Sequence, residues 1–218
     1  MASYHMCSMA FTVSFSSKIF LFTSWYSDSQ FALICLMLDE TLTSFFRSSM
    51  ALVEEATRNA DGSNCITFVP RTTEKTYIKV INGSGCWSFV GMQLTEGVQE
   101  LSLKIPGCMV RGTVAHEFIH ALGFWHEQSR PDRDEFIEVV WDKISEANRH
   151  NFNKYSTDLV DLLDLPYDYG SVMHYGDKGF SIDGSKTIVV KQPGATIGQR
   201  VNLSPIDDQE IRKYYGCN

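Results

Sequence analysis

Residues 116–126 hold three of the chain's six histidines together with one glutamate. His116 and His120 are four residues apart, a spacing that places two side chains on one face of an α-helix. Two imidazoles on one face can bind a single metal ion, and a catalytic zinc ion takes three protein ligands and keeps a further position for water. The spacing therefore predicts a helix that supplies two ligands of a zinc site.

The third histidine, His126, is too far along the sequence to reach the same ion on a continuous helix. Gly123 lies between, and glycine readily takes the left-handed conformation that ends helices, so the chain can turn back and bring His126 to the metal. Glu117 follows the first histidine and is placed to take a proton from a zinc-bound water, whose pKa the metal lowers to about 7. Together these residues predict a hydroxide that attacks a carbonyl group.

The same residues fit the pattern H-E-x-x-H-x-x-G-x-x-H, which together with a later Met-turn is the metzincin signature. A pair of histidines on an amphipathic helix is often structural, and a bare H-E-x-x-H also occurs by chance. The extended pattern argues against both alternatives. A purely structural zinc ion fits poorly as well, because closed structural sites use four protein ligands.

The surrounding residues predict that a helix over residues 110–122 carries the site. An apolar stripe at four-residue spacing lies roughly opposite His116 and His120. The stripe consists of Val110, Val114, Phe118 and Leu122. We expect this stripe to pack in the core while the histidines face the metal.

Local patterns predict the remaining elements. Residues 48–60, followed by Gly62, are expected to form a helix with a glycine stop. Alternating apolar residues bounded by turns predict short strands at 65–69, 77–81, 86–90 and 99–103. A second short helix is expected at 142–152, and a terminal helix at 204–214 opens with a Ser-Pro cap signal.

Two further segments resemble the astacin family. Residues 127–134 read EQSRPDRD, which continues the family's site motif, and residues 171–175 read SVMHY, which matches its Met-turn. The resemblance implies that Met173 forms a hydrophobic floor beneath the zinc. It also implies that Tyr175 is a removable fifth zinc ligand that stabilises the tetrahedral intermediate, and a phenol can donate a hydrogen bond to an oxyanion. For His174, between them, we expect a structural hydrogen bond.

The resemblance also implies the fold and the cross-links. We expect an α+β protein of the metzincin, zincin-like type with two lobes and a substrate cleft between them. The upper lobe would combine a mixed, twisted sheet with the active-site helix, and the lower lobe would be irregular and mostly helical. The implied disulfides are Cys65 with Cys217 and Cys86 with Cys108, and Glu127 is the candidate partner of a freshly cut N-terminal amine.

Residues 1–35 do not resemble the family, so we expect an atypical N-terminal segment followed by an astacin-like catalytic domain at residues 36–218. The segment lacks the F-x-G-D motif of family propeptides, and its apolar runs are too short to span a bilayer. A signal-like sequence and a mispredicted start are both open interpretations. Cys7 and Cys35 are either paired with each other or free thiols.

Length and charge limit the function. The chain has 218 residues, enough for one catalytic domain and little more. Its net charge of −7 and the lack of any long Lys/Arg run argue against nucleic acid and anionic membrane as partners. The implied disulfides indicate an oxidising, extracellular route, which the sequons at Asn82 and Asn202 also fit.

The leading hypothesis is a secreted, monomeric zinc endopeptidase with one zinc ion per chain and a protein or peptide substrate. Vertebrate hatching-enzyme and egg-cortical members of the family, which act on egg-envelope glycoproteins, look most similar. Digestive or general extracellular members would share every catalytic residue. The alternative is a catalytically silent adhesive or recognition protein of the same fold, suggested by the atypical N-terminus.

Overall fold

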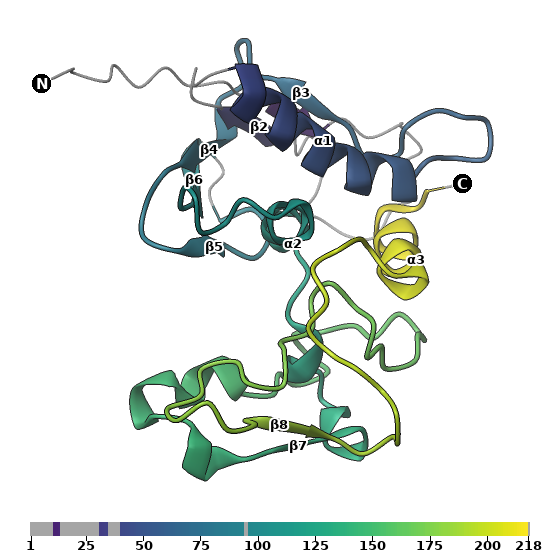
Figure 1. Ribbon diagram of the computed structural model, residues 1–218. Coiled ribbons are helices and arrows are strands. Elements are labelled where there is room, and N and C mark those ends of the chain that lie inside the picture. Colours follow the sequence, from purple (N-terminus) through teal and green to yellow (C-terminus); the bar gives the residue numbers. More distant parts are fainter. Residues whose placement is uncertain (1–10, 14–30, 35–39, 94–95, 218) are drawn as a thin grey trace, which may run out of the picture. The chain divides into compact units, whose positions relative to one another are not determined.

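Figure 1 shows a computed structural model of the chain, which describes residues 11–13, 31–34, 40–93 and 96–217. Cys7 and Cys35, whose pairing the sequence leaves open, lie outside these residues. Within the described part of the chain, none of the helices is both long enough and apolar enough to cross a membrane.

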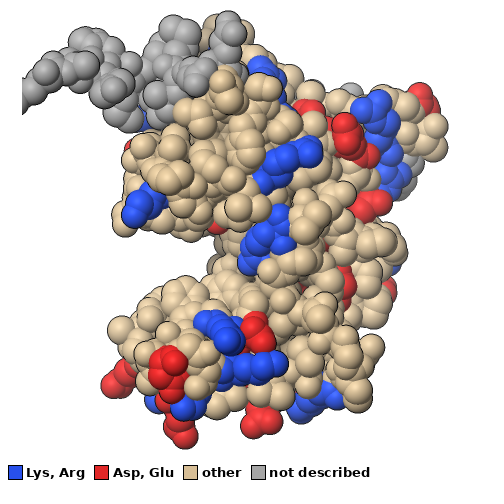
Figure 2. Space-filling view, in the orientation of Figure 1, with Lys and Arg blue, Asp and Glu red and all other residues tan. Residues whose placement is uncertain are grey.

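The chain divides into two compact units. The first unit consists of Met1–Phe124 together with Ile211–Asn218, and the second consists of Trp125–Glu210. On the face drawn in Figure 2, basic and acidic side chains of the described residues are interspersed over the second unit.

Among its described residues, the first unit contains a mixed six-stranded sheet. Its strands are β1 (Phe11–Val13), β2 (Phe31–Ile34), β3 (Phe68–Pro70), β4 (Thr76–Ile81), β5 (Cys86–Ser88) and β6 (Gly97–Leu103). They lie in the order β1-β3-β2-β4-β6-β5. β4 runs parallel to β2 and β6, whereas β5 runs antiparallel to β6 at the edge of the sheet. The mixed sheet that we expected is therefore present.

Two strands differ from their predicted bounds for physical reasons. The expected strand at 65–69 begins only at Phe68, because the chain bends at Cys65 and Ile66, and both side chains are buried without joining the sheet. The strand expected at 86–90 ends at Ser88. Beyond it the chain leaves the sheet, and the N–H of Gly91 donates to the carbonyl of His120 at 2.8 Å.

The first helix, α1 (Glu40–Ala56), begins and ends earlier than the predicted range of 48–60. Its buried face already starts at Phe46 and continues through Met50 and Val53, at helical spacing. Gly62 is not the helix stop. It has a φ of +86° in the turn after the helix, where its N–H donates to the carbonyl of Asn59 at 2.9 Å.

The second helix, α2 (Arg111–Ala121), carries the histidine motif and agrees with the predicted range of 110–122. It contacts α1 and β5, and its residue Phe118 packs on Phe68 of β3 with ring centroids 5.1 Å apart. The expected apolar stripe is wrong at Val110, which precedes the first turn and is 48% exposed. The histidine face is buried as well, so α2 is enclosed nearly all round.

Two disulfides cross-link the described part of the first unit. Cys65 is bonded to Cys217 near the C-terminus, across a sequence separation of 152 residues. Cys86 of β5 is bonded to Cys108, 22 residues later and just before α2. These are the two pairs that the family resemblance implied, and the second holds the edge strand close to the start of the histidine helix.

The second unit is irregular, as expected, and its helices are short. It contains a two-stranded antiparallel sheet of β7 (Ile137–Val139) and β8 (Ile188–Val190), and four 3-10 helices at Glu127–Ser129, Arg133–Glu135, Trp141–Lys143 and Glu146–Phe152. The single helix expected at 142–152 is wrong. The segment is broken at Ile144, which is extended and pairs with Ser181 in an isolated antiparallel bridge.

The last helix, α3 (Pro205–Tyr215), agrees with the prediction for residues 204–214. Ser204 caps it, because the Ser204 hydroxyl oxygen accepts hydrogen bonds from the N–H groups of Ile206 and Asp207, at 3.1 and 2.9 Å. Pro205 occupies the first helical position, where its missing N–H costs nothing.

Candidate active site

α2 places two of the predicted ligands side by side. The ring centroids of His116 and His120 are 4.5 Å apart, and both side chains are buried. Nδ1 of His120 lies 2.8 Å from the carbonyl oxygen of Phe124, which can only accept, so Nδ1 carries the proton. Nε2 of His120 therefore keeps its lone pair available to a metal.

The helix ends at Gly123, as its sequence position predicted. Gly123 has a φ of +108°, and its N–H donates to the carbonyl of His120 at 2.8 Å. The N–H of Phe124 donates to the carbonyl of Ile119 at 3.2 Å. These paired bonds form a Schellman motif, which redirects the chain immediately after the second histidine.

After this turn, His126 joins the other two histidines. One ring nitrogen from each of His116, His120 and His126 can be chosen so that all three lie within 4.8 Å of one another. Three imidazole nitrogens at such separations suit one zinc ion with an open position, so the side chains present fit the metal.

Glu117 lies on α2 directly after the first histidine and is buried. The sequence already selected it as the base, and burial keeps bulk water from the carboxylate. A carboxylate on the same helix as two zinc ligands is suited to accept a proton from a water molecule at the metal.

The predicted Met-turn, residues 171–175, lies within the second unit. Met173 is buried, and its N–H donates to the hydroxyl oxygen of Ser171 at 2.9 Å. The Ser171 hydroxyl in turn donates to Asp207 of α3 at 2.6 Å, and the N–H of Val172 donates to the same carboxylate at 2.9 Å. The buried carboxylate of Asp207 therefore holds the turn in its shape.

Tyr175 lies beside the third histidine. Its ring centroid is 4.4 Å from that of His126, with the two ring planes inclined at 57°. The N–H of Tyr175 donates to Oε1 of Gln128 at 3.0 Å, so the residue two positions after His126 also fixes the backbone of Tyr175. The sequence selected Tyr175 but gave no reason to select Gln128.

His174 makes the structural hydrogen bonds that we expected. Its Nδ1 lies 2.7 Å from the carbonyl oxygen of Tyr175 and must donate to it. Its Nε2 lies 2.7 Å from the hydroxyl of Tyr167 and accepts from it. Burial lowers the pKa of His174 to about 4, so the imidazole is neutral near pH 7.

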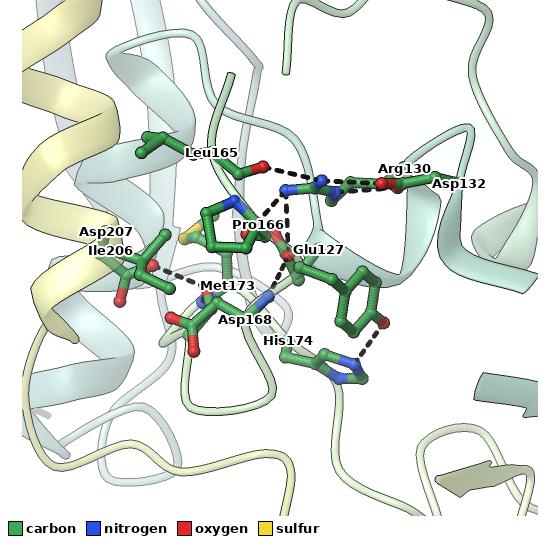
Figure 3. Close-up of polar contacts among 12 residues, drawn as sticks. Glu127, Arg130, Asp132, Leu165, Pro166, Asp168, Met173, His174, Ile206 and Asp207 are labelled. Carbon is green, nitrogen blue, oxygen red and sulfur yellow. Dashed lines mark hydrogen bonds and ion pairs between the residues drawn. The ribbon is translucent and has the colours of Figure 1, made fainter. Parts of the chain in front are cut away.

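Glu127 lies in a buried cluster of charged side chains, which Figure 3 shows. Its Oε1 accepts from the N–H of Asp168 at 2.7 Å and lies 3.4 Å from a guanidinium nitrogen of Arg130. Arg130 is shared with Asp132 and with the carbonyls of Leu165 and Pro166. A single buried guanidinium thus serves several acceptors.

Two acidic groups of this cluster, Glu127 and Glu210, have raised pKa values. Burial raises the pKa of Glu127 well above its usual range, and the charge of Glu210 adds to the rise, while Arg130 opposes it. Burial and the charge of Asp207 raise the pKa of Glu210 to about 7. Sequence reasoning selected Glu127 but missed Asp168, Asp207 and Glu210, because no local spacing connects them with it.

Comparison with known proteins fits this geometry. A family model described as Astacin, a peptidase family, matches residues 24–216. This chain belongs to the astacin family. The resemblance seen in the sequence and the expected α+β metzincin fold are thereby confirmed.

Relatives of this astacin chain come from several animals. It is 47% identical to meprin A subunit beta of Homo sapiens over 156 residues, which are 71% of this chain and 22% of that protein. It is 42% identical to high choriolytic enzyme 1 of Oryzias latipes over 170 residues, 77% of this chain and 61% of that protein. The chain thus spans about a fifth of the length of the meprin relatives.

Two solved structures support the same fold. A hatching enzyme zinc-protease from medaka, high choriolytic enzyme 1, has a TM-score of 0.68 and 42% identity, and the match covers 78% of this chain and 84% of that one. The structure of myroilysin has a TM-score of 0.56 at 24% identity, with coverage of 80% and 88%, and supports the fold alone.

Proposed function

We propose that this astacin chain is a zinc-dependent endopeptidase. The observation that carries the proposal is the approach of three histidine nitrogens to within 4.8 Å of one another, with a buried glutamate on the same helix as two of them. Relatives described as zinc metalloproteinases, among them nas-4 of Caenorhabditis elegans at 42% identity, support it.

His116, His120 and His126 would hold one zinc ion per chain. When bound, zinc acts as a Lewis acid and lowers the pKa of a coordinated water to about 7. Glu117 accepts the proton of the attacking water and then delivers it to the leaving amine nitrogen of the peptide. The bond from His120 Nδ1 to the Phe124 carbonyl fixes the orientation of that ring.

Tyr175 would donate the hydrogen bond that stabilises the oxyanion of the tetrahedral intermediate. Its ring next to His126 supports this role, since preorganised donors contribute strongly where charge develops. Met173 would supply the buried apolar floor of the site. The backbone of both residues is held by hydrogen bonds, since the N–H groups of Met173 and Tyr175 donate to Ser171 and Gln128 and the carbonyl of Tyr175 accepts from His174.

Glu127 would accept the ammonium group of a freshly cut N-terminus. Its cluster supports this, because the carboxyl groups of Glu127, Asp207 and the half-buried Glu210 outnumber the guanidinium of Arg130. A further positive charge would allow more of these acids to ionise. We keep the catalytic domain at residues 36–218 as a proposal, while the family match extends into the preceding segment from residue 24.

We propose extracellular proteins as substrates of a secreted, monomeric enzyme. The two disulfides support an oxidising route. Similarity to high choriolytic enzyme 1, a hatching enzyme zinc-protease in the medaka fish, supports egg-envelope glycoproteins as the specific substrates. Incubation of isolated envelopes with the active chain and with Glu117→Gln tests this, and intact envelopes after both treatments would limit the proposal to general proteolysis.

The central test is hydrolysis of a fluorogenic peptide by the full chain and by a version trimmed to residues 24–218, each with and without a zinc chelator. This version begins where the family match begins and keeps β2 of the sheet. Glu117→Gln is the matched control, because it keeps the shape of the side chain and removes the base. We expect chelator-sensitive cleavage that falls by about 10²–10⁴-fold in Glu117→Gln. One bound zinc per chain without cleavage by either version would reject the peptidase and favour a silent binding protein.

A further inference from the structure

Three aromatic rings surround Tyr175 within the second unit. The ring centroid of Tyr175 lies 4.4 Å from that of His126, 5.7 Å from that of Phe152 and 5.5 Å from that of Phe180. Phe152 is completely buried in the core of the unit, whereas Phe180 is 43% exposed. Phe180 therefore forms the solvent-facing wall of this aromatic enclosure.

Phe180 takes an unusual backbone conformation. Its φ is +56°, in the left-handed region that costs energy for any residue with a Cβ and is rare for a bulky one. Gly179 precedes it, and glycine adopts positive φ freely, yet Gly179 is absent from the positive-φ residues of the described chain. The strained position thus falls on the phenylalanine although a glycine is adjacent.

The surrounding chain imposes this conformation. On one side, the Thr187 hydroxyl donates to the carbonyl of Gly179 at 2.7 Å, and Thr187 is fully buried. On the other side, Ser181 pairs with Ile144, and its N–H donates to the carbonyl of Lys178 at 3.1 Å. A strained residue persists where its neighbours fix it on both sides, and such residues cluster at functional sites.

Burial does not account for a phenylalanine at this position, since much of its ring faces solvent. Its ring contacts the rings of Phe152 and Tyr175. The backbone of Tyr175 is already fixed by hydrogen bonds from its N–H to Gln128 and from His174 to its carbonyl. The ring contacts of Tyr175 act on its side-chain torsions rather than on its backbone.

We propose that Phe180 is a positioning residue for Tyr175. The ring of Phe180 closes the solvent side of the enclosure and limits the directions in which the phenol of Tyr175 can lie. Phe152 restricts the same phenol from the core side. This inference rests on the proposed function, in which the hydroxyl of Tyr175 meets the oxyanion. Small displacements of such a donor reduce turnover strongly.

Phe180→Gly is the informative substitution, because glycine removes the ring and also suits a φ of +56°, so the turn keeps its shape. We expect kcat on a fluorogenic peptide to fall by about tenfold or more, with KM changed by less than about twofold. Phe180→Tyr keeps the ring and should stay near the wild-type kcat. Asp164→Gly, at an exposed residue with a φ of +52°, controls for relief of backbone strain alone.

A double mutant separates positioning from general damage. In a Tyr175→Phe background the hydroxyl is already absent, so Phe180→Gly should cause no further loss of kcat. A similar loss in both backgrounds would overturn the proposal, as would a wild-type kcat for Phe180→Gly in the native background.

A second readout uses the metal-free chain and does not depend on activity. ¹³C-labelled tyrosine NMR, with the Tyr175 signal assigned through Tyr175→Phe, reports the environment and ring motion of the phenol. We expect Phe180→Gly to shift this signal and accelerate ring flipping, while Asp164→Gly leaves it unchanged. An unchanged signal in Phe180→Gly contradicts the inference, and an inactive wild-type chain with a changed signal contradicts only the proposed function.

Discussion

The backbone N–H of Glu127 donates a hydrogen bond to the backbone carbonyl of Met173, with the two atoms 3.3 Å apart. A second bond, from the N–H of Tyr175 to the side chain of Gln128 at 3.0 Å, joins the same two segments. Two hydrogen bonds therefore join the Met-turn to the residues that follow the third histidine.

Replacing Gln128 by Leu tests this pairing. Leucine is similar in volume to glutamine and suits this fully buried position, but it leaves the N–H of Tyr175 without its side-chain acceptor. A buried donor without a partner costs about 1–3 kcal/mol, so urea unfolding should show a loss of that size. Gln209→Leu, at an exposed residue of α3, should change the free energy of unfolding little; equal losses in both variants would contradict the pairing.

Gly123→Ala should impair zinc binding through the backbone. A Cβ at Gly123 would meet no atom closer than 4.0 Å, but its φ of +108° strains any other residue by roughly 1–2 kcal/mol. We expect a lower melting temperature and weaker zinc retention in dialysis, because the turn to His126 shifts. Gly62→Ala, with a φ of +86° and open space around it, should lower only the melting temperature.

Glu210→Gln should change how stability depends on pH. The pKa of Glu210 rises from 4.5 to about 7 in the folded chain, mainly through burial. Between these values the folded state holds a proton that the unfolded state has released, so stability falls as pH rises through this window. The loss is at most about 3 kcal/mol at pH 8, and Glu210→Gln should remove it.

Chemical denaturation at pH 5 and pH 8 measures this effect. Glu138→Gln, at an exposed strand residue, is the matched control and should keep the wild-type dependence. The groups facing Glu210 include Glu127, Asp207, Asp168 and Arg130, so part of the response belongs to the cluster. Identical pH profiles for wild type and Glu210→Gln would show that Glu210 ionises freely.

His174 should titrate in the opposite sense. Burial lowers its pKa from 6.5 to about 4. At pH values between these two, the imidazole is protonated in the unfolded state and neutral in the folded state. Stability is therefore lost as pH falls through this window, by up to about 3 kcal/mol. NMR titration of the His174 ring should give a midpoint near 4, and a midpoint above 6 would refute its buried neutral state.

The sequence predicted the histidine helix well because its signals are local. Four-residue spacing places His116 and His120 together, and Gly123 marks the turn within the same few residues. The terminal helix was equally predictable, since Ser204 and Pro205 form a cap signal at its start. Both predictions depend only on neighbours along the chain.

Local sequence patterns did not predict the features that depend on contacts between residues far apart in the chain. Ile144 pairs with Ser181, and this breaks the helix that local propensity favoured at 142–152. The bond between Glu127 and the N–H of Asp168 spans 41 residues, so no local spacing could reveal that cluster. The left-handed conformation of Phe180 likewise depends in part on the pairing of Ser181 with Ile144, which is distant in sequence.

The bond between Cys65 and Cys217 has a consequence for biosynthesis. The first unit contains Ile211–Asn218, so its last segment is translated only after the whole of the second unit. During translation on the ribosome, the second unit is complete while Cys65 still lacks its partner. The covalent closure of the first unit must therefore follow the translation of the whole second unit, and any premature stop codon before residue 217 would leave a reactive thiol at Cys65.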